Sequence, residues 1–198
     1  MERTATATMD TQRPREWRFW GGWGLAWVGF PLGGLAASAL VGSVGSAAEG
    51  ALAGAAAGAV VGAAQWLVLS RRLPLSPWWV AATSAGMAAG LALSIQLLGS
   101  EMAGGAVLLR GLVAGAGIGL AQTPLLRRID ARALAWGPVV ALGWALGWLT
   151  STAAGVGLAP YAVFGLFGAL AFQLLSGLAL AWLLRRAPGV SSRLAPAV

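Results

Sequence analysis

Six apolar stretches, each long enough to cross a lipid bilayer as a helix, make up most of this chain. The hydrocarbon core of a bilayer is about 30 Å thick, so a helix that spans it needs about 20 predominantly apolar residues. Arginines, acidic residues and prolines separate the stretches. We therefore expect an all-α integral membrane protein with six transmembrane helices. The predicted helices cover residues 20–46, 47–69, 78–99, 102–125, 134–157 and 160–184.

The composition excludes several other classes of protein. Only 10% of the 198 residues are charged and 58% are hydrophobic, whereas a soluble domain carries about 25% charged residues. A soluble globular fold is therefore excluded. The chain has no cysteine and no histidine, which excludes a disulfide framework, iron–sulfur clusters and the usual zinc and haem ligands. We expect neither a cofactor nor a metal site.

The basic residues are distributed unevenly along the chain. All 13 are arginines, and all but Arg110 lie in the N-terminal tail or in the segments after the second, fourth and sixth predicted helices. These segments alternate with loops that carry none, which is the pattern of cytoplasmic loops in the positive-inside rule. We expect both termini in the cytoplasm and the lipid bilayer as a partner. Arginines spread over four segments do not form one groove for nucleic acid, so no nucleic-acid partner is expected.

Several tryptophans lie near the same arginine-rich helix ends. Their amphipathic rings favour the boundary between the apolar core of a membrane and water, so we expect them to face that interface. They are Trp17, Trp20, Trp23, Trp78, Trp79, Trp136 and Trp182.

Three pairs of glycines recur at a constant spacing of 57 residues. They are Gly29 and Gly33, Gly86 and Gly90, and Gly143 and Gly147. The same offset relates Arg71 to Arg128 and Arg185, and Gln65 to Gln122. We interpret the offset as three tandem helical hairpins, related by a pseudo-threefold axis along the membrane normal. The hairpins would cover residues 20–76, 77–133 and 134–190, between a basic cytoplasmic N-terminal tail of residues 1–19 and a cytoplasmic C-terminal tail of residues 191–198.

Glycines also recur at every fourth position within the predicted helices. This spacing places them on one face of a helix and makes a groove into which the backbone of a second helix fits. We expect these grooves to pack helices inside the protein; the alternatives are a glycine-lined pore and a docking groove for a partner helix. The glycines concerned are Gly29, Gly33, Gly54, Gly58, Gly62, Gly86, Gly90, Gly111, Gly115, Gly119, Gly143 and Gly147.

Four polar side chains in the predicted helices are candidates for a functional site. Arg110 lies nine residues after Glu101, which places it about 13.5 Å from the outer helix end. An arginine at such depth costs about 2.5–3.5 kcal/mol to insert and needs a partner. We expect a charge pair with Glu49, at the outer end of the second helix; the alternative partner is an anion or a lipid headgroup. Gln65 and Gln122 are expected to hydrogen-bond between helices or to line a polar vestibule.

A short pattern accompanies the two glutamines. Residues 58–71 contain Gly-x-x-x-Gly-x-x-Gln followed by an arginine, with Trp79 beyond it, and residues 115–128 repeat this arrangement before Trp136. The pattern resembles a group of small bacterial polytopic membrane proteins that have tandem hairpins and no assigned activity. The resemblance implies a multi-pass protein and no particular function, and we accordingly expect it in the bacterial plasma (inner) membrane.

The residues give little support for catalysis. The acidic residues are too dispersed to form a metal site or an acid–base pair, and no histidine or lysine is present to activate a serine. We therefore predict a non-enzymatic protein. Two classes of function remain: a structural or accessory protein that binds partner helices or itself through its glycine grooves, and a channel or transporter for a small solute or anion. In the second case Arg110, Gln65 and Gln122 would line the path.

Overall fold

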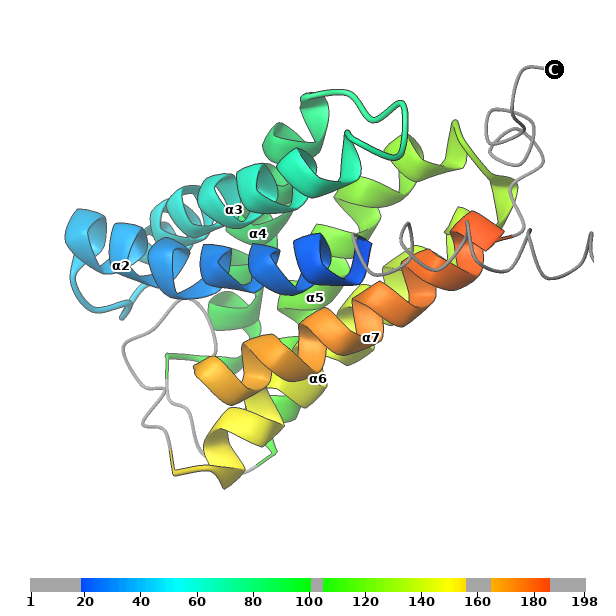
Figure 1. The fold of residues 1–198 in the computed structure, drawn as a ribbon. Helices are drawn as coiled ribbons and strands as arrows, with labels where there is room; N and C mark the ends of the chain where they lie inside the picture. Colours follow the sequence, from blue (N-terminus) through cyan, green and yellow to red (C-terminus); the bar gives the residue numbers. More distant parts are fainter. Residues whose placement is uncertain (1–18, 101–104, 156–164, 186–198) are drawn as a thin grey trace, which may run out of the picture.

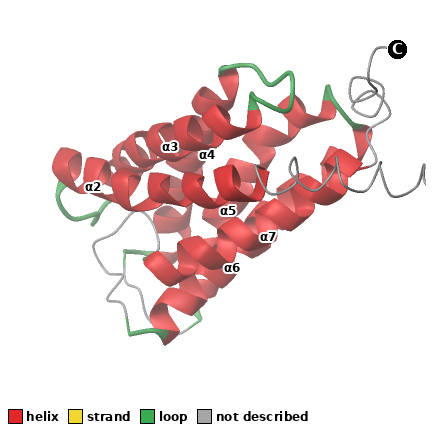
Figure 2. Cartoon of the chain, viewed as in Figure 1, coloured by secondary structure: helices red, strands yellow, loops and turns green. Residues whose placement is uncertain are grey.

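The computed structural model describes residues 19–100, 105–155 and 165–185, and every regular element in these ranges is a helix (Figure 1 and Figure 2). Six helices in them are long and apolar enough to cross a membrane, so the chain is a multi-pass membrane protein, as predicted. The first span, Phe19–Val41, contains a short 3-10 turn. The elements are η1 (Ala26–Val28), α2 (Gly29–Val41), α3 (Ala47–Leu69), α4 (Trp78–Leu98), α5 (Ala106–Arg127), η2 (Ala131–Ala135), α6 (Trp136–Ala153) and α7 (Leu166–Arg185).

The turn between the first two spans is set by local residues. The first span ends at Val41, before its predicted end at residue 46, because Gly42 follows with a φ of 66°. This left-handed conformation suits glycine and ends a helix. Ser46 then begins α3 with a capping box, in which its hydroxyl accepts a hydrogen bond from Glu49 N and the Glu49 carboxylate accepts one from Ser46 N.

Each helix packs against the next one along the chain. The contacts are most extensive between α3 and α4 and between α5 and α6. α7 returns to the first span, and Figure 1 shows α2 and α7 on the same side of the bundle. The six spans therefore form a ring whose order in space follows their order in the sequence.

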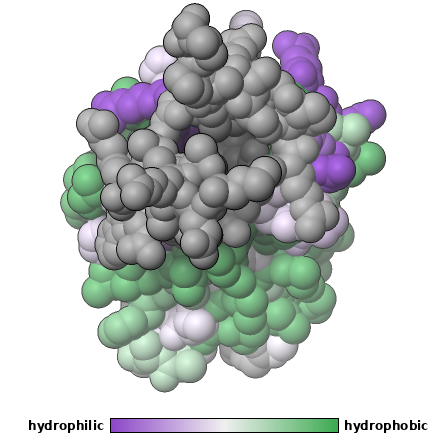
Figure 3. Space-filling model, turned by 45° about the vertical axis from the view of Figure 1, so that its right-hand side comes forward, coloured by the Kyte–Doolittle hydropathy of each residue, from purple (hydrophilic) through white to green (hydrophobic). Residues whose placement is uncertain are grey.

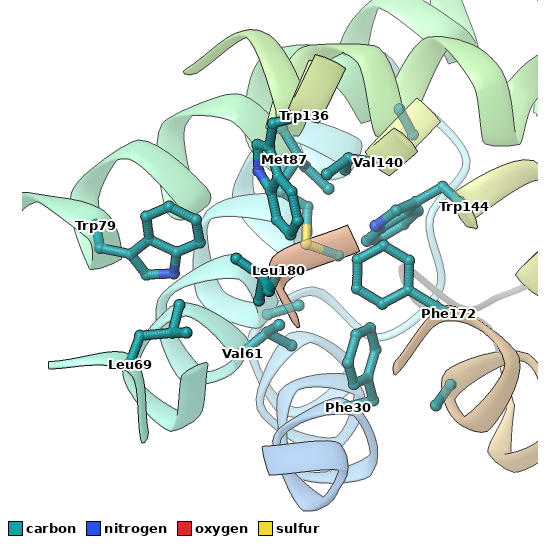
Figure 4. Close-up of a cluster of buried hydrophobic side chains, with 14 of the residues drawn as sticks. Phe30, Val61, Leu69, Trp79, Met87, Trp136, Val140, Trp144, Phe172 and Leu180 are labelled. Atoms are coloured by element: carbon teal, nitrogen blue, oxygen red, sulfur yellow. The ribbon is translucent and has the colours of Figure 1, made fainter. Parts of the chain in front are cut away.

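The centre of this ring is filled by large apolar side chains. Phe30, Val61, Met87, Trp144 and Phe172 come from five different spans, are at most 3% exposed and gather in one cluster (Figure 4). The Phe172 ring centroid lies 5.6 Å from that of Phe30 and 6.3 Å from that of Trp144. α5 contributes aliphatic residues to the same core. All six spans thus share one core.

The outward faces of the helices carry leucines, which in a bilayer meet the acyl chains. Leu32, Leu35, Leu52, Leu93, Leu120, Leu142 and Leu174 are each more than half exposed. On the face drawn in Figure 3, apolar residues form the lower part and hydrophilic residues lie at the upper end. The α3–α4 and α5–α6 connections share one end of the ring, which we call the arginine end because it carries Arg71, Arg72, Arg127, Arg128 and Arg132.

Candidate functional site

A buried glutamine on α5 joins three helices. Gln122 is 2% exposed. Its Oε1 accepts a hydrogen bond from Trp136 Nε1 of α6 at 2.8 Å, and its Nε2 donates one to Thr83 Oγ1 of α4 at 2.8 Å. The Thr83 hydroxyl donates in turn to the Trp79 carbonyl at 2.8 Å. A polar group among apolar helices costs free energy unless it is hydrogen-bonded, and here both ends of the amide have a partner.

A second glutamine makes a matching contact one helix pair earlier. Gln65 on α3 is 3% exposed, and its Oε1 accepts a hydrogen bond from Trp79 Nε1 on α4 at 3.3 Å. The indole rings of Trp79 and Trp136 also meet, with their centroids 6.2 Å apart (Figure 4). Gln65, Trp79, Thr83, Gln122 and Trp136 therefore form one buried cluster, which we name the glutamine–tryptophan network.

The position of each pair along its helices explains why the partners meet. Each glutamine lies near the C-terminal end of its helix, and each tryptophan is the first or second residue of the next one. The short connection reverses the chain, so these helix ends lie side by side. The interhelical hydrogen bonds expected of both glutamines are present. Their partners, Trp79 and Trp136, were not identified from the sequence. The sequence held a signal for them, since an interval of 14 residues from glutamine to tryptophan occurs twice.

The contact that closes the ring uses a different arrangement. Trp23 Nε1 of the first span donates to the Gln173 carbonyl of α7 at 2.9 Å, and Gln173 Nε2 donates to the Trp23 carbonyl at 2.5 Å. Both residues are buried. A buried tryptophan and a glutamine again hold two spans together, although through main-chain oxygens and at positions that the 57-residue offset does not relate.

The expectation that the tryptophans face the membrane interface is wrong for three of them. Trp23, Trp79 and Trp136 are at most 1% exposed, because their indole N–H groups bond inside the bundle. Trp78 and Trp182 do lie outside, at 70% and 44% exposure. Adjacent tryptophans thus serve different roles. Of the others, Trp20 is partly buried and Trp17 lies outside the described residues.

Arg110 lies closer to a helix end than predicted. α5 begins at Ala106 rather than at residue 102, so Arg110 is about 6 Å along the axis from the first residue, and the predicted depth of about 13.5 Å is wrong. The guanidinium donates to the Gly99 carbonyl and, at 3.3 Å, to the Ser100 carbonyl. These carbonyls follow the C-terminal end of α4, where the helix dipole favours a cation.

Glu49 does not bond to Arg110. Its Oε2 accepts hydrogen bonds from Gly45 N at 2.9 Å and Ser46 N at 2.8 Å. The predicted charge pair is wrong because each charged group has a local role: the acid caps the N-terminus of α3 and the arginine caps the C-terminus of α4. The sequence held a signal for the first cap, since Ser-x-x-Glu at 46–49 is the pattern of a capping box.

Arg110→Ala and Glu49→Ala are therefore expected to destabilise the bundle independently. Each removes a helix cap, and such a loss costs about 0.5–2 kcal/mol. In a double-mutant cycle measured by thermal unfolding in detergent, the two effects should add to within about 0.5 kcal/mol. Glu49→Gln, which keeps an acceptor oxygen, is the matched control and should cost less than Glu49→Ala. A coupling energy above about 1 kcal/mol would show that Glu49 and Arg110 interact directly after all.

The glycine pairs of α2 and α4 face the following helix. A Cβ atom on Gly33 would lie 3.0 Å from the Ala57 carbonyl oxygen of α3, and one on Gly90 would lie 2.6 Å from the Ala114 carbonyl oxygen of α5. Gly29 and Gly86 approach the same two helices as closely. The third pair, on α6, packs against α7: a Cβ atom on Gly143 would lie 2.9 Å from the Phe172 ring, and one on Gly168 of α7 would meet the Gly147 carbonyl.

The glycines at every fourth position of α3 face α4, and those of α5 face α6. A Cβ atom on Gly54 would lie 2.7 Å from the Met87 carbonyl oxygen of α4, and one on Gly111 would lie 2.6 Å from Ala145 Cα of α6. Gly58, Gly62, Gly115 and Gly119 make equally close approaches to the same two helices. The chain's own helices therefore fill these grooves. They are not open to a partner helix, contrary to one of the expectations.

A small cavity lies at the arginine end of the ring. Its volume is about 20 Å³, and it is lined by Leu73, Leu126, Ile129, Asp130, Ala133, Leu180 and Leu183. This volume is about that of one water molecule. Nowhere in the described ranges do three or more aspartate or glutamate side chains come together in a way that could hold a metal ion. No family model, curated protein or solved structure matches the chain.

Proposed function

We propose that this multi-pass protein is a non-enzymatic structural or accessory component of the bacterial plasma membrane. The observation that carries the proposal is the filled centre of the helix ring, where Phe30, Met87, Trp144 and Phe172 pack together (Figure 4). A channel or transporter needs a polar path along this axis. The buried amides of Gln65 and Gln122 bond to indole groups instead.

We propose further that the hairpins 20–76, 77–133 and 134–190 are equivalent units about a pseudo-threefold axis along the membrane normal. Contacts that recur at the 57-residue offset support this: the two glutamine–tryptophan bonds, and the approach of Gly33 and Gly90 to the next helix. The third unit has diverged, because Phe172 and Ala179 stand where the first two units have glycine and glutamine.

The membrane orientation that we propose places residues 1–19 and 191–198 in the cytoplasm. Six spans put both termini on the same side, and the arginine-rich connections share that end of the ring. Lipid covers the leucine-rich outer face. A partner protein or a second copy of the chain would also bind there, because the glycine grooves are filled from within.

The proposal predicts that the purified protein does not conduct solutes. In liposomes, chloride efflux and glycerol uptake are expected to match the rates of protein-free liposomes, because the core cluster fills the centre of the ring. A channel protein reconstituted in the same lipid serves as the positive control. Solute flux clearly above background that falls on Gln122→Leu would establish the alternative, a channel or transporter.

A further inference from the structure

The arginine end presents a basic surface formed by two connections. Arg71 and Arg72 follow α3, Arg127 ends α5, Arg128 follows it and Arg132 lies in η2; all five are exposed. We call these five residues the arginine surface. The acid that the structure places among them is Asp130, and its carboxylate accepts a hydrogen bond from Arg132 N at 2.7 Å. The surface therefore has a clear excess of positive charge.

The two connections are fixed relative to each other. Trp66 Nε1 of α3 donates to the Leu75 carbonyl at 3.0 Å and holds the first connection against its helix. Leu73 of the first connection and Ile129 of the second line the same small cavity. Because these contacts hold the backbone of both connections in place, little backbone conformational entropy is lost when a ligand binds to the arginines.

The surroundings of the arginine surface are typical of the headgroup layer of a membrane. Exposed apolar side chains lie at the same helix ends, namely Trp78 at 70%, Leu134 at 59% and Trp182 at 44% exposure. Exposed tryptophans favour the boundary between acyl chains and water. In Figure 3 the hydrophilic residues lie at one end, directly above the apolar part of the face. In a bilayer that covers the apolar part of this face, the arginines would lie next to the lipid phosphates.

We propose that the arginine surface binds the headgroups of anionic phospholipids in preference to zwitterionic ones. A guanidinium donates two parallel hydrogen bonds to a phosphate and keeps its charge at any physiological pH. A zwitterionic headgroup carries a cation next to its phosphate. The excess positive charge of the arginine surface repels this cation. Phosphatidylglycerol has no such cation and fits the charge of the surface.

The test compares the binding of two lipids to the purified protein in neutral detergent. Dioleoyl-phosphatidylglycerol is expected to bind more tightly than dioleoyl-phosphatidylcholine, as measured by native mass spectrometry and by the rise in melting temperature. In the triple variant Arg71→Gln, Arg127→Gln, Arg128→Gln, affinity for phosphatidylglycerol should fall about 100-fold, since each arginine near an anionic surface contributes about fivefold. Affinity for phosphatidylcholine should change little.

Two controls separate charge from folding. The triple Arg→Lys variant at the same positions keeps the charge and should retain most of the preference. Gln96→Ala removes an exposed polar residue near the opposite end and should leave the preference unchanged. For the parent protein, raising the salt concentration from about 50 mM to about 500 mM should weaken phosphatidylglycerol binding, because the charges are exposed and screened. This last measurement needs no variant and holds even if the triple Gln variant does not fold.

Three results would overturn the proposal. One is equal binding of both lipids by the parent protein, and another is an unchanged preference in a folded triple Gln variant. The third is tighter binding of a single-stranded oligonucleotide than of phosphatidylglycerol, which would assign the surface to nucleic acid. None of these results depends on solute flux, so they are distinguishable from failure of the proposed function.

Discussion

Gly90→Leu is expected to cost several kcal/mol of bundle stability, the largest effect of any single change considered for this protein. A Cβ atom at this position would lie 2.6 Å from the Ala114 carbonyl oxygen and 2.8 Å from Ala114 Cα. Both are backbone atoms of α5, which cannot turn aside as a side chain can. Overpacking a core costs about 1–3 kcal/mol, and separating α4 from α5 adds the loss of close packing, on which helix association in lipid depends. Thermal unfolding in detergent, followed by circular dichroism, measures the effect.

The same substitution at an outward-facing glycine is the matched control. Gly24 lies in the first span, is exposed, and would carry a Cβ atom with nothing within 4 Å. Gly24→Leu should therefore change the stability by no more than about 0.5 kcal/mol. If Gly90→Leu unfolds at the temperature of the parent protein, the contact between α4 and α5 is looser than described and the grooves do not hold the bundle together.

Gln122→Leu is expected to have the second-largest effect, about 1–3 kcal/mol. Leucine has nearly the volume of glutamine, so the change leaves little cavity. It removes the acceptor of the Trp136 N–H group and the donor to Thr83 Oγ1, each bonded at 2.8 Å. A buried donor left without a partner costs about 1–3 kcal/mol, somewhat less where a membrane protein can rearrange. Thermal unfolding again provides the measurement, and the fluorescence of the buried Trp136 should change with it.

Two other glutamines provide a graded comparison. Gln65→Leu removes a single hydrogen bond at 3.3 Å and should cost less than about 1 kcal/mol. Gln96→Leu places an apolar side chain on the exposed face of α4, which meets lipid, and should be neutral or slightly stabilising. Equal effects at Gln122 and Gln96 would show that the glutamine–tryptophan network contributes nothing to stability.

The sequence was sufficient to locate the spans, because a membrane acts as a solvent that selects long apolar segments. The predicted segment 47–69 coincides with α3, and the predicted start at residue 78 coincides with that of α4. Boundaries failed where a local conformation decided them: Gly42 ends the first span through its positive φ, and α5 starts only at Ala106. Interhelical hydrogen bonds of both glutamines were one of the two expectations from the sequence, and the spacing of the glycines was visible in it.

Only the tertiary structure decided which groups meet. Trp78 and Trp79 are neighbours in the same apolar segment, yet one is exposed and the other buried against Gln65. The mistaken pairing of Glu49 with Arg110 has the same origin. Glu49 binds the backbone at the start of α3, and Arg110 binds the carbonyls that follow the end of α4. In a soluble protein the polar face of a helix reveals its rotation. In a bilayer the outer face is as apolar as the core, so the pattern of residues fixes where each helix runs but not how it is turned.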